Sequence, residues 1–196
     1  MANKCTIATW KKRTEETYHE HIEQYANLEV DLLLLGDSMF ERLKTTGKDF
    51  WPETSLICNA GVGGDKIQNV LWRLEQGLLT KIKARKIILM IGTNNVETDS
   101  ISNICEGIVA ILKEISTEVV VLGILPRNPH PSDRKAQRIK DTIKGVNEWL
   151  KLNLKIPYLD HSEPFFQRDD LYEDHVHLNE EGYQIWCKLL NKINQE

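Results

Sequence analysis

The stretch VDLLLLGDSMF, residues 30–40, decides how the rest of the sequence is interpreted. It joins a run of four leucines, residues 32–35, to the turn-forming tripeptide Gly36-Asp37-Ser38. A short apolar run bounded by a turn residue is typical of a buried strand in a parallel sheet. The turn after such a strand lies at the carboxyl edge of the sheet, where open α/β folds bind ligands. Ser38 therefore stands where a nucleophile would stand, although it could also be a simple N-cap of the next helix.

Short apolar runs and helical repeats alternate along the rest of the chain. Further strands are predicted at residues 55–58, 86–91, 118–125 and 156–159, and helices are predicted at residues 8–27, at 65–78, from 99 or 100 onward, around 139–150 and around 186–193. Strands that alternate with helices favour a parallel sheet covered on both faces. We therefore expect an α/β protein, a three-layer α/β/α sandwich with a central five-stranded parallel sheet. A chain of 196 residues fits one domain, 1–196, with residues 1–28 as a helical segment packed on it.

Two of the later predicted strands also end in residues that are suited to a ligand-binding or catalytic site. The second runs into NAGVGGD, residues 59–65, where three glycines allow the backbone to approach a ligand closely and Asp65 is the expected N-cap of the following helix. The third ends in GTNN, residues 92–95, and an asparagine side chain there can donate to a negatively charged oxygen. The alternatives are a flexible loop for the first segment and an Asx turn for the second.

The segment DHVH, residues 174–177, precedes the last predicted helix, for which Asn179 is the expected cap. A D-x-x-H spacing lets the carboxylate of Asp174 fold back against the imidazole of His177, an arrangement that prepares a histidine to take a proton from a serine. Asp160 is the rival acid, because it also ends a strand. An H-x-H metal pair formed by His175 and His177 lacks a well-placed third ligand, so we expect no metal.

Composition excludes several other classes of protein. The net charge of −4 leaves no basic footprint for nucleic acid, and a content of 41% hydrophobic and 28% charged residues is normal for a globular protein. The four cysteines are far apart and form no C-x-x-C pair, which favours reduced thiols in the core. With neither an apolar run of eighteen residues nor a signal-type start, we expect a cytoplasmic protein without stable membrane insertion.

Taken in order, the blocks GDS, NAGVGGD, GTNN and DHVH resemble those of the GDSL or SGNH hydrolase superfamily. NAGVGGD followed by VLWRL, residues 70–74, and then by GTNN is most similar to the catalytic subunits of platelet-activating-factor acetylhydrolase isoform Ib and their bacterial relatives. The resemblance implies the flavodoxin-like fold of SGNH hydrolases and an ester hydrolase that needs no cofactor. One departure is Met39, which stands where the motif has leucine.

The resemblance also implies roles for individual residues. Ser38 would be the nucleophile, His177 the general base and then general acid, and Asp174 the residue that orients His177. The oxyanion hole would combine the backbone N–H groups of Ser38 and Gly64 with the side chain of Asn94.

The substrate is expected to be a small ester. Met39, Thr93 and Val176 adjoin the proposed catalytic groups and are of a size to enclose a small acyl pocket, which together with the resemblance favours acetyl esters. The alternatives are a carbohydrate O-acetylesterase of the same superfamily and a non-catalytic binding or scaffold subunit. A homodimer would match the relatives.

Overall fold

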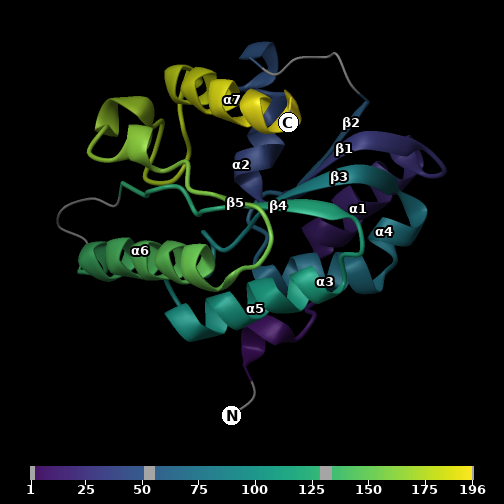
Figure 1. Ribbon diagram of the computed structural model, residues 1–196, viewed down its shortest axis with the longest axis horizontal. Coiled ribbons are helices and arrows are strands. Elements are labelled where there is room, and N and C mark those ends of the chain that lie inside the picture. Colours follow the sequence, from purple (N-terminus) through teal and green to yellow (C-terminus); the bar gives the residue numbers. More distant parts are fainter. Residues whose placement is uncertain (1–2, 51–55, 129–133, 196) are drawn as a thin grey trace.

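A computed structural model describes residues 3–50, 56–128 and 134–195 of the chain (Figure 1). Within these residues five parallel strands form one sheet in the order β2-β1-β3-β4-β5. The strands are β1 (Glu29–Gly36), β2 (Ile57–Gly61), β3 (Lys83–Met90), β4 (Glu118–Leu122) and β5 (Tyr158–Leu159). The sheet confirms the predicted α/β architecture.

Helices cover both faces of the sheet. The α-helices are α1 (Lys12–Tyr25), α2 (Ser38–Glu41), α3 (Ile67–Glu75), α4 (Leu78–Lys81), α5 (Ile101–Lys113), α6 (Ala136–Asn153) and α7 (Glu180–Gln195). Short 3-10 helices are η1 (Lys4–Thr6), η2 (Arg42–Lys44), η3 (Lys48–Phe50), η4 (Glu163–Phe165) and η5 (Asp169–Leu171). In Figure 1, α3, α5 and α6 lie below the sheet and α7 lies above it.

The leucines of β1 show why both faces of the sheet must be covered by helices. Leu33 and Leu35 belong to the apolar cluster formed with α3, α5 and α6, whereas Leu32 and Leu34 belong to the cluster formed with α2 and α7. All four are at most 1% exposed. Because successive side chains of a strand point to opposite faces, a continuous apolar run is what a central strand of a three-layer fold requires.

The order of the strands determines where a site can form. From β1 the chain moves outward to β2 and then returns to the other side of β1 to form β3. In open α/β sheets ligands bind at such a switch point, beyond the carboxyl ends of the two strands. Here these ends are Gly36 and Met90, which are paired in register, and a Cβ atom on Gly36 would lie 2.3 Å from the Met90 carbonyl oxygen. Glycine is therefore required for β1 and β3 to approach so closely.

Several predicted boundaries shift in the structure. Ser55, the start of the predicted second strand, lies outside the described residues, and β2 extends on to Gly61. The helix expected at 65–78 is divided into α3 and α4, because Gly77 adopts a left-handed conformation with φ of +82°. The fifth strand is reduced to Tyr158 and Leu159.

The N-terminal segment packs against the sheet layers through α1, which contacts α3, α4 and β2. That this segment and the rest form one folding unit over residues 1–196 stays a prediction. All four cysteines are buried and none forms a disulfide, as expected. In the described part of the chain, no helix is both long and apolar enough to cross a membrane.

Candidate active site

Ser38 is the first residue of α2, directly beyond the end of β1. The N-cap of this helix is Asp37, whose carboxylate accepts a hydrogen bond of 3.0 Å from the Met39 N–H. Capping by Asp37 leaves the Ser38 hydroxyl available for another partner, so the simple N-cap interpretation of Ser38 is wrong. The Ser38 N–H has no acceptor within the helix either, because the first N–H groups of an α-helix never do.

The partner of the Ser38 hydroxyl is His177. The His177 Nε2 lies 2.8 Å from Ser38 Oγ, and on the other side of the ring Nδ1 lies 2.7 Å from Asp174 Oδ2. The second carboxylate oxygen of Asp174 accepts hydrogen bonds from the backbone N–H groups of Val176 and His177, at 2.7 and 2.8 Å. The D-x-x-H segment thus folds back on itself as expected, and three side chains form one continuous chain of hydrogen bonds.

The hydrogen bonds around Asp174 stabilise the ionised form of its carboxyl group. Partial burial alone would raise the pKa of the carboxyl, but the hydrogen bonds from the His177 ring and from the backbone N–H groups of His177 and Val176 outweigh it and lower the pKa to about 2. The carboxylate is therefore ionised at any ordinary pH. A fixed negative charge at Nδ1 favours the tautomer that leaves Nε2 able to accept the serine proton.

Neither rival interpretation of these residues fits the geometry. Asp160 accepts hydrogen bonds from the backbone N–H and the hydroxyl of Ser162, and so stabilises its own turn. His175 bonds through Nδ1 to the Asn128 carbonyl oxygen at 2.8 Å, whereas both ring nitrogens of His177 face Asp174 and Ser38. The two histidines are therefore not aimed at a shared ion.

The two remaining expected site residues, Gly64 and Asn94, lie close to each other. The Asn94 Nδ2 donates to the carbonyl oxygen of Asp65, the residue after Gly64, at 2.9 Å. Gly64 has a φ of +72°, in the left-handed region that favours glycine. In the described part of the chain, no residue accepts a hydrogen bond from the Gly64 N–H. Asn94 is thus held in the loop that follows β3, by the residue next to a glycine whose N–H is available to a ligand.

Asp65 corrects an expectation from the sequence. The cap of α3 is Lys66 and the helix begins at Ile67, so Asp65 is not its N-cap. Instead the Asp65 carboxylate lies 3.0 Å from Nη2 of Arg73, and both side chains are fully buried. Arg73 also donates to the carbonyl oxygens of Ala60 and Gly36, at 2.6 and 3.0 Å. A buried ion pair therefore ties α3 to the ends of β1 and β2 beneath the site.

Helical periodicity does not reveal this pair, because Asp65 lies before the first residue of α3. Arg127 was likewise not predicted: after β4 its guanidinium bonds to Glu97 at 2.8 Å and to the Thr93 carbonyl oxygen at 3.4 Å. It thereby supports the loop that carries Asn94.

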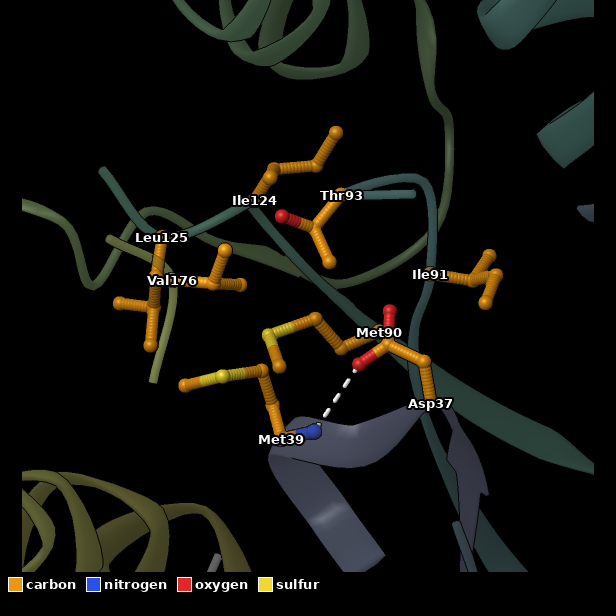
Figure 2. Close-up of a pocket in the computed structure, with 8 residues that line it drawn as sticks. All are labelled: Asp37, Met39, Met90, Ile91, Thr93, Ile124, Leu125 and Val176. Atoms are coloured by element: carbon orange, nitrogen blue, oxygen red, sulfur yellow. Dashed lines mark hydrogen bonds between the residues drawn. The ribbon is translucent and has the colours of Figure 1, made fainter. Parts of the chain in front are cut away.

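Figure 2 shows a small pocket whose lining includes Met39, Thr93 and Val176, the sequence neighbours of the serine, the asparagine and the histidine. Its cavity volume is about 10 Å³, which is the space of about one water molecule. It is lined by Asp37, Met39, Met90, Ile91, Thr93, Ile124, Leu125 and Val176. The three residues expected to form an acyl pocket, Met39, Thr93 and Val176, are therefore brought together, and the lining is mostly apolar.

Comparison with known proteins agrees with this fold. Residues 34–185 match the model of the GDSL-like Lipase/Acylhydrolase family. The chain belongs to this family. Among curated proteins it is similar to platelet-activating factor acetylhydrolase IB subunit alpha2 of Homo sapiens, with 33% identity over 183 residues that cover 84% of this chain and 76% of that protein. The family and the particular relatives expected from the four sequence blocks are thus confirmed.

Solved structures support the fold at lower sequence identity. A GDSL-like lipase from Bacteroides thetaiotaomicron superimposes with a TM-score of 0.71 at 19% identity, covering 93% of this chain and 97% of that one. A carbohydrate acetylesterase from Sinorhizobium meliloti superimposes with a TM-score of 0.65 at 14% identity, covering 84% and 98%. The flavodoxin-like arrangement predicted for the sheet is that of these acylhydrolases.

Proposed function

We propose that the protein is a serine esterase that hydrolyses short-chain esters, acetyl esters foremost, through an acyl-enzyme on Ser38. The observation that carries the proposal is the unbroken chain from Ser38 Oγ through His177 to Asp174, at 2.8 and 2.7 Å. It lies at the switch point of the sheet, next to a small apolar pocket. The family supports ester hydrolysis, and the geometry supports these particular residues.

In the first half-reaction Ser38 Oγ attacks the ester carbonyl carbon while His177 Nε2 takes the hydroxyl proton. The carbonyl oxygen becomes negatively charged and accepts hydrogen bonds from the N–H groups of Ser38 and Gly64 and from the Asn94 side chain. Collapse of this intermediate breaks the bond to the alcohol, which leaves with the proton from His177. The imidazolium formed in between is stabilised by the Asp174 carboxylate.

In the second half-reaction water replaces the alcohol. His177 takes a proton from the water, the resulting hydroxide attacks the acyl carbon, and the oxyanion site again holds the negative oxygen. Ser38 leaves with the proton from His177, and the acid is released. Every step uses groups of this chain and water, so the proposal requires no cofactor.

The pocket supports a short acyl group. Its volume of about 10 Å³ accommodates little more than a methyl group without movement of its walls. Met39, Thr93 and Val176 immediately follow or precede Ser38, Asn94 and His177 in the chain, so the pocket lies where the acyl part of the bound ester would extend. The methyl of an acetyl group fits this space, whereas an octanoyl chain would have to displace core side chains.

A carbohydrate O-acetylesterase is the second candidate, and one observation favours it. A groove with a cavity volume of about 940 Å³ lies between α6 and residues 160–172, and Pro126, Arg127 and Asn128 on its wall directly follow pocket residues Ile124 and Leu125. Aromatic side chains, including the 59% exposed Phe166, lie along it beside polar groups. Such a groove suits a sugar as the leaving group.

Hydrolysis of p-nitrophenyl acetate, butyrate and octanoate tests the proposal, with Ser38→Ala as the control. We expect acetate to be the best substrate and Ser38→Ala to be inactive on all three. Release of acetate from acetylated sugars distinguishes the second candidate. If wild type is folded but hydrolyses none of these substrates, the non-catalytic binding subunit becomes the better hypothesis. Cytoplasmic location and a homodimer stay predictions.

A further inference from the structure

The turn that carries Gly64 has a peptide group that the turn itself does not fix. Residues 62–65 are closed by a hydrogen bond of 3.1 Å from the Asp65 N–H to the Val62 carbonyl oxygen. A positive φ at the third position, +72° at Gly64, is what a type II turn requires. The central peptide, which joins Gly63 to Gly64, takes no part in the closing bond. Type I and type II turns differ by a rotation of this peptide of roughly half a turn.

Lys11 holds that central peptide from outside. Its ammonium group donates to the carbonyl oxygens of Gly63 and Gly64, at 3.3 and 3.0 Å. In a planar trans peptide the C=O and the N–H point in opposite directions. A cation that fixes the Gly63 oxygen on one side therefore fixes the Gly64 N–H on the other.

Residues on both sides of Lys11 are themselves anchored, Thr9 through its backbone and Arg13 through its side chain. Thr9 exchanges hydrogen bonds with α3, donating its N–H to the Gln68 carbonyl oxygen at 2.9 Å and accepting from Asn69 Nδ2 at 2.9 Å. Arg13 binds both carboxylate oxygens of Glu41, at the end of α2, at 3.0 Å. The segment that carries Lys11 is thus bound to α3, which follows the turn, and to α2, which begins with Ser38.

We propose that Lys11 is a positioning residue for the oxyanion site, which it serves by locking the Gly63–Gly64 peptide with its N–H turned toward the reacting ester. The inference rests on the proposed function, in which the Gly64 N–H is one of the oxyanion donors. Lys11 has a second effect on the same group. A hydrogen bond at the carbonyl end of a peptide polarises it, and such cooperativity strengthens the N–H as a donor by roughly 10–30%.

Lys11→Met tests the inference, because methionine keeps the length of the side chain and removes the ammonium group. The matched control is Lys12→Met at the adjacent lysine, whose side chain is 78% exposed and which pairs with Glu16 on the surface of α1. Loss of a direct oxyanion donor costs about 10²- to 10³-fold in kcat. Because Lys11 acts through the peptide, we expect kcat for p-nitrophenyl acetate to fall about tenfold, with KM nearly unchanged.

Two further measurements separate positioning from a general loss of structure. Lys11→Arg keeps a cationic donor and is expected to recover most of the lost kcat. A boronic acid that forms a tetrahedral adduct with Ser38 should bind Lys11→Met about tenfold more weakly, whereas the thermal midpoint should match that of Lys12→Met. Wild-type kcat in Lys11→Met, or an equal fall in Lys12→Met, would overturn the inference. An inactive wild type would instead overturn the proposed function.

Discussion

The side-chain amide of Asn94 is held by the backbone carbonyl of Asp65, with 2.9 Å between Nδ2 and the oxygen. An amide NH₂ group has two hydrogens, so this bond fixes the plane of the amide and leaves the second hydrogen for a ligand. Asp65, whose carbonyl accepts this bond, is itself fixed in place, because its carboxylate lies 3.0 Å from the guanidinium of the buried Arg73. A donor fixed in this way needs no reorganisation when an oxyanion forms.

Asn94→Ala should therefore abolish most activity without unfolding the protein. Removal of one oxyanion donor costs about 2.7–4 kcal/mol, or about 10²- to 10³-fold in kcat. Steady-state kinetics on p-nitrophenyl acetate measures the loss, and a turnover rate equal to wild type would remove Asn94 from the site.

The neighbouring Asn95→Ala provides the matched control. Asn95 is fully buried, accepts a hydrogen bond from the Ile67 N–H and donates to Gln68 and Asp99. Its replacement should lower the thermal midpoint, since buried partners lose their hydrogen bonds. Asn94→Ala should leave the midpoint nearly unchanged.

Asp174→Asn and Asp160→Asn distinguish the two acids that the sequence offered. Asp174 faces Nδ1 of His177. Within the described chain, the side chain of Asp160 accepts hydrogen bonds only from Ser162. An amide at position 174 favours the wrong tautomer of the imidazole, so kcat should fall between about 10²- and 10⁴-fold. Asp160→Asn should remain near wild type. A larger loss in Asp160→Asn would reverse the assignment.

Val176→Ala should relax the selection of the acyl group. The substitution removes two methyl groups from the wall of the small pocket shown in Figure 2. One methylene in an apolar pocket is worth about 10- to 200-fold in discrimination, so the ratio of kcat/KM for butyrate to that for acetate should rise at least tenfold. Val119→Ala, the same change in β4 outside the pocket lining, should leave the ratio unchanged. An unchanged ratio in Val176→Ala would mean that this pocket does not receive the acyl group.

Asp37→Asn should stabilise the protein at alkaline pH more than at acidic pH. Burial raises the pKa of the Asp37 carboxyl from 3.8 to about 7, against the opposing effect of the Met39 N–H. Between these two values the folded state holds a proton that the unfolded state has released, so this group makes stability fall as pH rises from about 4 to about 7.

Asparagine has no such titration and can still accept the capping hydrogen bond from Met39. The thermal midpoint of Asp37→Asn relative to wild type should therefore be higher at pH 8 than at pH 5, by a difference on the order of 5 °C. The same difference from wild type at both pH values would show that the Asp37 carboxyl is not protonated in the folded state.

Much of the architecture follows from local patterns in the sequence. The leucines of residues 32–35 predicted a central strand because a continuous apolar run only suits a strand covered on both faces. Ser38 and the loop of Asn94 could be expected at one edge because strand ends of a parallel sheet meet there, whereas the role of His177 was implied by the resemblance to the family. The spacing of Asp174 and His177 required only one turn of backbone, so their contact was predictable as well.

Other features depend on contacts between distant segments, which periodicity does not encode. Asp65 looked like a helix cap, but its partners Arg73 and Thr14 reach it from α3 and α1. Ser38 was a possible cap of α2 from the sequence, but the cap is Asp37, whose carboxylate accepts a hydrogen bond from the Met39 N–H. The contact of Lys11 with the Gly63–Gly64 peptide spans more than fifty positions and had no signal in the sequence.

The most direct test of the central claim is to incubate the protein with a fluorophosphonate probe and to map the adduct by intact mass and peptide analysis. The account predicts a single adduct on Ser38, formed by wild type and absent from Ser38→Ala, because only this serine hydroxyl lies 2.8 Å from a histidine oriented by a carboxylate within the described chain. A folded protein that forms no adduct, or that forms one on another serine, would contradict it.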